Sequence, residues 1–294
     1  MILALDIGGT FIKWAAAEGY DLKETGKFPT PQDSLEYLTD AVKEIMNSHP
    51  EMKFEGLAVS YPGMEDPETG YLVPFGALTY GLGKPVRKVF EATFGLPVSF
   101  ENDGRLAAYA ESRIGNLQGI RSGYVLVIGT GIGGAYVRNG RIEAGSHGYG
   151  GQISLFLTDD IRRNGLNAIW SAHCGMPGFL AKAKQRMQKE DLDGEILMKL
   201  VREKDEQACG LLDEYMNEFT NVLFTLQMVL DPERFVIGGG ISRDDLFIES
   251  MRNKYEEIYR MYSLDVKHAD IMPCRFHNTS NIMGALALYY DEHQ

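Results

Sequence analysis

The chain has 294 residues, a length that favours two domains of ordinary size over a single compact core. Hydrophobic residues make up 44% of it and charged residues 24%, which excludes a disordered or fibrous protein. The net charge is -12 and the basic residues are scattered, so we expect no nucleic-acid partner.

We expect no targeting signal from the first residues of the sequence. Met1 runs directly into the apolar stretch 2–5, which has no basic residues before it and is too short for a signal peptide or a membrane span. We therefore expect a cytoplasmic protein that does not bind membranes. Its cysteines, Cys174, Cys209 and Cys274, are far apart and form no C-x-x-C pair, so we expect all three to be reduced and structural.

Short β-type runs alternate with amphipathic helical segments along the chain, which predicts α/β architecture. Five predicted strands span residues 2–6, 56–60, 98–101, 124–128 and 234–237. Between the first two, Asp33 and Glu36 have capping-box spacing and predict the start of a helix. The apolar face of that helix comprises Leu35, Leu38, Val42, Ile45 and Met46. A second long helix is predicted by an apolar stripe made of Leu212, Tyr215, Met216, Phe219, Val222, Leu223, Leu226, Val229 and Leu230.

Two segments share one pattern of strand, glycine turn and strand. The first turn reads Asp6-Ile7-Gly8-Gly9-Thr10, and the second reads Gly129-Thr130-Gly131-Ile132-Gly133-Gly134. Glycines let backbone N–H groups converge on an anion, so two facing turns of this kind could hold a triphosphate. Taken singly, each turn is equally consistent with a tight hairpin. A third cluster, Gly238-Gly239-Gly240, could approach an adenine ring or simply connect a strand to a helix.

The second turn also matches the dinucleotide-binding pattern G-x-G-x-x-G through Gly129, Gly131 and Gly134. That pattern must open a helix, whereas residues 135–138 read as a strand that is followed by the hairpin turn Asn139-Gly140. The acidic residue expected about 20 positions later is also missing. The context therefore favours a phosphate turn over a nicotinamide-cofactor site.

Asp103 stands where the predicted strand 98–101 gives way to a helix. A carboxylate at the carboxyl end of a strand in an α/β protein is well placed to accept a proton from a substrate hydroxyl. Asn102 or Asp103 could instead serve only as the cap of the helix. The residue pattern by itself leaves both roles open.

The order and spacing of these motifs resemble the ROK family of bacterial sugar kinases and repressors. The resemblance runs over essentially the whole chain. The motifs that carry it are residues 6–10 with Lys13, Pro62-Gly63, Glu101-Asn102-Asp103, residues 129–134, residues 238–240 and Gly284-Ala285. It implies the actin-like (ribonuclease H-like) ATPase fold, with two α/β domains around a central cleft. We expect residues 1–115 and 281–294 to form the N-terminal domain and residues 116–280 the C-terminal domain.

The resemblance also implies a role for each motif, with ATP and Mg²⁺ as cofactors. Asp103 would be the general base, and Asp6 would orient Mg²⁺ through water. Residues expected to bind the ATP phosphates are Asp6, Gly8, Gly9, Thr10, Lys13, Gly129, Thr130, Gly131, Gly133 and Gly134. Adenosine would lie against Gly238, Gly239 and Gly240. Residues expected to bind the sugar are Gly63, Asn102, Asp103 and Gln152. Lys13 could equally be a solvated surface lysine.

Two further expectations follow from the resemblance. Family repressors carry an N-terminal helix-turn-helix domain, but here the first phosphate turn starts at Asp6, so we expect no DNA-binding module. Family likeness also implies a homodimer.

The chain departs from many relatives after the second turn, where it reads Gly150-Gly151-Gln152-Ile153-Ser154-Leu155. Leu155 replaces a histidine that binds structural zinc in those relatives, and their cysteine cluster is absent, so we expect no zinc site. His147, His173 and Cys174 could substitute only with a spacing that fits no standard pattern. Gln152 replaces the sugar-contacting glutamate, keeping a carbonyl acceptor while gaining an amide donor.

The sequence is therefore interpreted as a sugar kinase of the zinc-less branch, which includes β-glucoside kinases and related hexose kinases. The expected reaction transfers the γ-phosphoryl group of ATP to a hydroxyl, O6, of a hexose or a β-glucoside. N-acetylmannosamine kinase and glucokinase are alternatives. A catalytically inactive sugar-sensing regulator is the rival from another class, and the intact Asp103 and glycine turns disfavour it.

Overall fold

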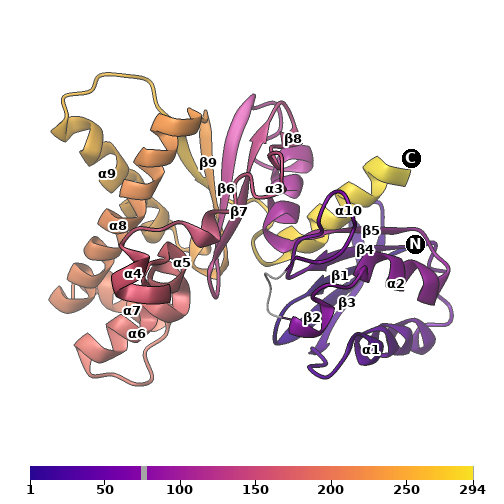
Figure 1. Cartoon of the computed structure of the whole chain (residues 1–294). Helices are drawn as coiled ribbons and strands as arrows, with labels where there is room; N and C mark the ends of the chain where they lie inside the picture. The colour runs from indigo at the N-terminus through magenta and orange to yellow at the C-terminus, as the bar shows by residue number, and fades with distance from the viewer. Residues whose placement is uncertain (74–77, 294) are drawn as a thin grey trace. The chain divides into compact units, whose positions relative to one another are not determined.

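The computed structural model describes residues 1–73 and 78–293 (Figure 1). Its contacts divide the chain into two compact units. The first unit consists of Met1–Ile114, Ala144–Gly150 and the segment from Thr279 onward, and the second consists of Gly115–Glu143 and Gly151–Asn278. Each unit contains one five-stranded mixed sheet with helices packed on it, so the predicted α/β architecture is confirmed.

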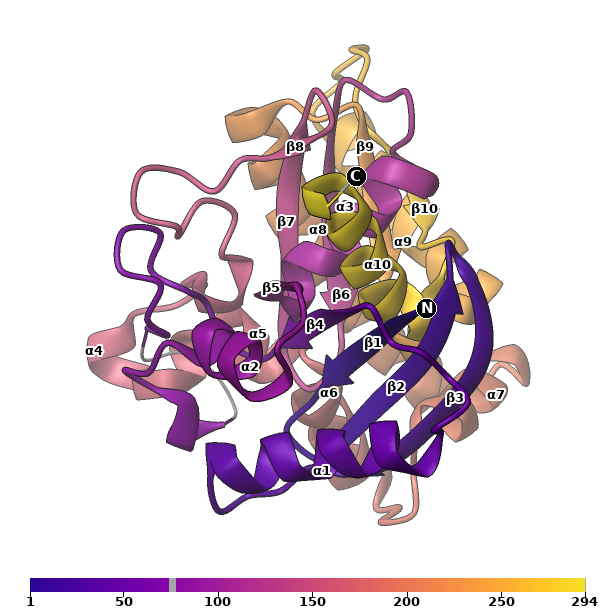
Figure 2. The same ribbon diagram turned by 90° about the vertical axis from the view of Figure 1, so that its right-hand side faces the viewer.

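The sheet of the first unit has the strand order β3-β2-β1-β4-β5. Its strands are β1 (Ile2–Ile7), β2 (Phe11–Glu18), β3 (Asp21–Pro29), β4 (Gly56–Tyr61) and β5 (Val98–Asn102). Its helices are α1 (Leu35–Ser48), α2 (Val86–Phe94), α3 (Asp103–Ile114) and α10 (Ser280–His293). Helices α1 and α2 cover one face of this sheet, and α3 and α10 cover the other (Figures 1 and 2).

Side chains of the central strand β1 alternate between the two faces of the sheet. Leu3, Leu5 and Ile7 belong to the apolar core that also contains residues of α1 and α2. Because successive side chains of a strand point to opposite faces, Asp6 points to the face that α10 covers. A Cβ on Gly284 of α10 would lie 1.9 Å from the carbonyl oxygen of Leu106, so α10 and α3 can pack this closely only with glycine there.

The start of α1 differs from the sequence-based prediction. Its N-cap is Ser34, whose Oγ accepts a hydrogen bond from the backbone N–H of Tyr37 at 3.3 Å. The expected capping box between Asp33 and Glu36 is therefore wrong, because the chain enters the helix one residue later. The predicted apolar face is confirmed, with four of its side chains buried and Met46 partly buried.

The sheet of the second unit has the strand order β10-β9-β6-β7-β8. Its strands are β6 (Ser122–Ile128), β7 (Ile132–Arg138), β8 (Arg141–Ile142), β9 (Arg234–Gly238) and β10 (Asp270–Pro273). Its helices are α4 (Ile161–Asn164), α5 (Trp170–Cys174), α6 (Met176–Met187), α7 (Gly194–Arg202), α8 (Glu206–Leu230) and α9 (Asp245–Met261). The predicted stripe of α8 is buried through Leu226, but Val229 is 73% exposed, so the stripe ends earlier than expected.

The two sheets repeat one topology. In each, two strands joined by a glycine turn pair antiparallel, β1 with β2 and β6 with β7, and the first of them also pairs parallel with a later strand. The repeat that the two turns suggest in the sequence is therefore confirmed. Within the described residues, no helix is both long enough and apolar enough to span a bilayer.

Candidate active site and phosphate turns

The first glycine turn connects β1 to β2 and is closed by backbone and side-chain hydrogen bonds. The N–H of Gly8 donates to the carbonyl oxygen of Phe11 at 3.0 Å. Thr30 Oγ1 donates to the carbonyl oxygen of Gly8 at 2.7 Å, and Gln32 Nε2 donates to that of Gly9 at 2.8 Å. These bonds occupy carbonyl oxygens of the turn, while Thr10 at its tip is exposed. A turn fixed in this way presents N–H and hydroxyl donors to an anion.

Asp6 is buried at the end of β1 and is held by three side chains. Its Oδ1 accepts hydrogen bonds from Asn281 Nδ2 at 2.9 Å and from Ser60 Oγ at 3.3 Å. Its Oδ2 accepts one from Lys13 Nζ at 3.2 Å, across the β1–β2 pair. Lys13 is thus tied to Asp6, although half of its side chain is exposed. An anchored carboxylate with its donors in place fits a hydrated Mg²⁺ ion better than direct coordination.

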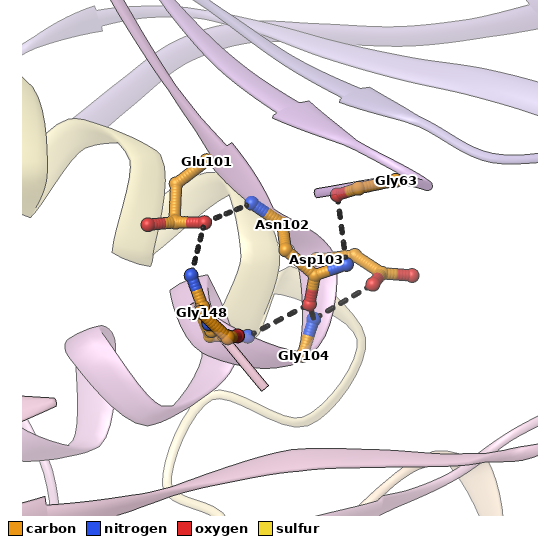
Figure 3. A network of polar contacts seen from close by, with 7 residues as sticks. Gly63, Glu101, Asn102, Asp103, Gly104 and Gly148 are labelled. Atoms are coloured by element: carbon orange, nitrogen blue, oxygen red, sulfur yellow. Dashed lines mark hydrogen bonds and ion pairs between the residues drawn. The ribbon is translucent and has the colours of Figure 1, made fainter. Parts of the chain in front are cut away.

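Asn102 caps α3 at the point where β5 ends. Its Oδ1 accepts the backbone N–H groups of Gly104 at 3.0 Å and Arg105 at 3.3 Å. Its Nδ2 donates to the carbonyl oxygen of Gly63 at 3.1 Å, so the predicted sugar-binding residues Gly63, Asn102 and Asp103 lie together (Figure 3). The capping role that the sequence left open belongs to Asn102.

Asp103 is the first residue of α3, and its carboxylate points away from Glu101 (Figure 3). It accepts a hydrogen bond from the N–H of Gly104 at 2.8 Å. Burial raises the pKa of Asp103 to about 6, the Gly104 N–H opposes this shift, and the negative charge of Asp6 adds to it. A carboxylate whose pKa lies this close to neutrality is ionised at pH 7 and can take up a proton.

An ion pair behind the cap ties a distant segment to α3. Glu101 Oε1 accepts the backbone N–H of Asn102 at 2.8 Å and lies 3.5 Å from Nη1 of the buried Arg105. Nη2 of Arg105 donates to the carbonyl oxygen of Gly148. This bond connects the segment Ala144–Gly150 to α3. The segment belongs to the first unit, although it is distant in sequence from the other parts of that unit.

The second glycine turn, between β6 and β7, is held by α5 and the start of α6. Ser171 Oγ accepts the N–H of Ile132 at 2.6 Å, and the N–H of Met176 donates to the carbonyl oxygen of Gly129 at 2.9 Å. A Cβ on Gly131 would lie 2.6 Å from Ser171 Oγ. At the far end, a Cβ on Gly134 would lie 1.9 Å from the carbonyl oxygen of Val125. Close packing therefore explains the glycines at positions 131 and 134.

The strand that follows this turn excludes a dinucleotide-binding motif. β7 begins at Ile132 and ends in the turn Asn139-Gly140, whose φ angles of 52° and 73° suit a tight hairpin. No helix begins at the glycines, so this segment is not a dinucleotide-binding motif of the Rossmann type.

The third glycine cluster borders a pocket of about 890 Å³ within the second unit. Gly239 has φ of 94°, and a Cβ there would lie 1.9 Å from the carbonyl oxygen of Ile128, so the turn after β9 requires glycine. Gly240 and Met176 line the pocket. Since the N–H of Met176 also binds Gly129, the pocket adjoins the second turn. Its size and place suit the adenosine part of a nucleotide.

The remaining predicted residues are divided between the two units. Gln152 belongs to the second unit, is half-buried, and donates from Nε2 to Ser154 Oγ at 2.7 Å. His147 belongs to the first unit, whereas His173 and Cys174 belong to α5 in the second. His173 and Cys174 converge with Glu218 of α8, a partner that the sequence did not indicate.

Comparison with known proteins decides the family. The family model described as "ROK family" matches residues 2–292. The chain belongs to the ROK family. The resemblance inferred from the motifs is therefore confirmed.

Individual relatives agree with this assignment. The chain is 29% identical over 259 residues to a β-glucoside kinase of Klebsiella pneumoniae, with 85% of each protein covered. It is 27% identical to an N-acetyl-D-glucosamine kinase of Vibrio parahaemolyticus, with 98% of this chain and 99% of that protein covered. A solved structure of a ROK family protein from Streptococcus pneumoniae TIGR4, in complex with sucrose, has a TM-score of 0.87 and 26% identity, with 99% and 98% covered. These similarities confirm the actin-like fold.

Three residues of this ROK protein that support the motifs were not found from the sequence. Ser60 and Asn281 hold Asp6, and Ser171 holds the second turn. Asn281 lies 275 residues from Asp6 and Ser171 lies 39 residues from Ile132, so no local pattern connects them. The ion pair of Arg105 with Glu101 could have been predicted from the sequence, because Arg105 follows Glu101 by four residues and carries the opposite charge.

Proposed function

We propose that the protein is an ATP-dependent sugar kinase, which transfers the γ-phosphoryl group of ATP to O6 of a hexose or a β-glucoside. The observation that carries this proposal is that Asn102 caps α3 while the neighbouring Asp103 has a raised pKa. Because Asn102 binds two N–H groups at the start of α3, the cap does not depend on Asp103 alone, and the Asp103 pKa of about 6 suits a base at neutral pH. The names of the relatives support a sugar as the acceptor.

In the proposed reaction, Asp103 accepts the proton of the sugar hydroxyl while the sugar oxygen forms a bond to the γ-phosphorus. The bond between that phosphorus and its bridging oxygen breaks, and ADP leaves with the electron pair. Phosphoryl transfer depends on positioning and charge neutralisation more than on covalent chemistry. The N–H groups and threonine hydroxyls of the two glycine turns would supply positioning, and Asp6 would hold the hydrated Mg²⁺ that neutralises charge.

Each substrate has its own proposed residues. Thr10, Thr130 and the glycines of the two turns would bind the phosphates, with Lys13 assisting near Asp6, and Gly238, Gly239 and Gly240 would border the adenosine. Gly63, Asn102 and Gln152 would line the sugar site. N-acetylmannosamine kinase and glucokinase activities are the alternatives within this class. The proposed assembly, by family likeness, is a homodimer.

An ATP-consumption assay with a sugar panel tests the proposal. The panel contains glucose, N-acetylglucosamine, N-acetylmannosamine, cellobiose and an aryl β-glucoside, each with Mg-ATP. We expect ADP to form only with sugar present, and the preferred acceptor identifies the branch. Sugar binding without turnover would instead support the regulator, and ATP hydrolysis indifferent to every sugar would contradict a sugar kinase.

Gln152→Glu tests the sugar site. A carboxylate keeps the acceptor but loses the amide donor, so activity should be redistributed among the sugars of the panel. The control for this change of charge is Gln207→Glu, because Gln207 is exposed. Gln227 is unsuitable as a control because it is buried. An unchanged sugar profile in Gln152→Glu would remove Gln152 from the site.

A further inference from the structure

Three metal-ligating side chains converge where α5 meets α8, outside the phosphate turns and the base. His173 and Cys174 end α5, and Glu218 lies on α8. One ligand atom of each, an imidazole nitrogen, the thiol sulfur and a carboxylate oxygen, lies within 4.8 Å of the other two. We propose that His173, Cys174 and Glu218 form a site for one thiophilic divalent cation of the zinc type.

The chemistry of the three ligands favours zinc over magnesium. Thiolate and imidazole prefer softer cations, whereas Mg²⁺ prefers an octahedron of oxygens. In a tetrahedral zinc site neighbouring ligand atoms lie about 3.5 Å apart, so the imidazole of His173 and the carboxylate of Glu218, which are in direct contact, need to separate by roughly 1 Å to admit the cation. Two of the three are partly exposed and can make that movement by small rotations.

The surroundings of His173 already orient its ring for coordination. Its Nε2 lies 2.9 Å from Thr158 Oγ1, and its Nδ1 contacts Glu218. In the metal-free protein this contact places the ring proton on Nδ1, which donates to Glu218, and Nε2 accepts from the Thr158 hydroxyl. When a cation takes the place of that proton, the ring proton sits on Nε2 and is donated to Thr158, and the Nδ1 lone pair is available to the metal. A hydrogen bond from the other ring nitrogen is the usual support of a metal-binding histidine.

The site has an open side as well as a closed one. Cys174 is buried, and its backbone carbonyl accepts the hydroxyl of Tyr215 at 2.8 Å, which fixes the closed side. A pocket of about 630 Å³, lined by Thr158, His173 and Glu218 among others, lies on the open side. Three protein ligands with one position facing a pocket leave room for a water molecule as the fourth ligand.

Metal binding here displaces one proton. The cation binds sulfur as the thiolate, and the proton passes to solvent.

The position of the site connects it to the second phosphate turn. α5 also carries Ser171, which binds the N–H of Ile132. A cation that ties α5 to α8 therefore stabilises the element that holds this turn. This site differs from the family zinc site, whose histidine is replaced by Leu155, and it revises the expectation that the chain has no zinc site.

Zinc titration of chelator-treated protein, in excess Mg²⁺ and without ATP, tests the proposal. We expect one Zn²⁺ per chain and a higher melting temperature in the zinc-bound protein. Glu218→Gln and His173→Gln should each raise the zinc Kd about 10- to 100-fold. Glu214→Gln, on the same helix one turn earlier, and Cys209→Ser should bind zinc like the unaltered protein.

Cobalt substitution identifies the sulfur ligand. Co²⁺ should give a thiolate charge-transfer absorption that Cys209→Ser retains and Cys174→Ser loses. If Cys174→Ser does not fold, Glu218→Gln decides, because its side chain is partly exposed. Absence of saturable zinc binding, or unaltered zinc affinity in Glu218→Gln, would overturn the site.

Discussion

Asp6 and Asp103 lie close enough within the first unit for the charge of Asp6 to raise the pKa of Asp103, in addition to the larger effect of burial. Asp6 ends β1, and Asp103 follows β5. The two strands are separated by β4 alone, and both run parallel to it. Their carboxyl ends therefore meet at one edge of the sheet, where ligands of α/β proteins commonly bind.

The first prediction is that Asp103→Asn abolishes phosphoryl transfer without unfolding the protein. Asparagine cannot accept the proton, so kcat should fall on the order of 10²–10⁴-fold. Because Asn102 provides the cap, the substitution should leave α3 intact. Asp40→Asn, on the exposed surface of α1, is the control. An active Asp103→Asn protein would sink the proposed base.

The second prediction concerns the pH dependence of the rate. Asp103 acts in its ionised form, so kcat/KM should fall about tenfold per pH unit below pH 6 and level off above it. The rate is measured between pH 5 and 8, with ATP affinity measured alongside because ATP itself titrates in this range. A flat profile at constant ATP affinity would contradict a base with a pKa near 6.

The third prediction concerns stability. The folded protein holds the Asp103 proton more tightly than the unfolded chain does, so this group stabilises fully below pH 4 and loses that contribution as pH rises through 6. Asn does not titrate. Relative to the unaltered protein, Asp103→Asn should therefore gain about 1–2 kcal/mol in free energy of unfolding between pH 4 and pH 7, a value reduced from the full shift because the side chain is partly exposed. Urea unfolding at both pH values measures the difference. If the difference in free energy of unfolding between the two proteins were the same at pH 4 and pH 7, the Asp103 pKa would not be raised.

The fourth prediction separates a phosphate turn from a simple hairpin. Gly129→Ala meets no atom within 4 Å, so it should leave stability unchanged and yet weaken ATP binding about tenfold, because a Cβ would crowd the phosphates. Gly131→Val should weaken ATP binding and also lower the melting temperature, since it collides with Ser171. Calorimetric titration with Mg-ATP measures both. Normal ATP affinity in Gly129→Ala would favour the simple hairpin.

The fifth prediction tests how Asp6 is positioned. Asn281→Ala removes one donor to Asp6, so the KM for Mg-ATP should rise roughly 3- to 10-fold, with a smaller change in kcat. Asn217→Ala removes a similar bond, to Asp213 on the surface of α8, and should change neither constant. A KM unchanged in Asn281→Ala would show that Ser60 and Lys13 suffice to hold Asp6.

Local chemistry in the sequence determined the strands, the two glycine turns and the position of Asp103. These features depend on neighbouring residues: alternating apolar side chains build a strand, and glycine permits a close turn. The capping pattern at α1 was less informative, because Asp33 and Ser34 are both good caps and a shift of one residue leaves the helix unchanged.

The tertiary structure alone decided which side chains complete these motifs. Asn281 reaches Asp6, Glu218 reaches His173 and Arg105 reaches Gly148 only because helix packing brings together residues that are distant in sequence. It also decided that Asn102 is the cap of α3. The sequence could not make this choice, because Asn102 and Asp103 are both suitable capping residues by type. Side-chain geometry separates the two: Asn102 binds two N–H groups of α3, whereas the burial of Asp103 raises its pKa. Neither distance nor burial is encoded in local pattern, so these assignments required the folded chain.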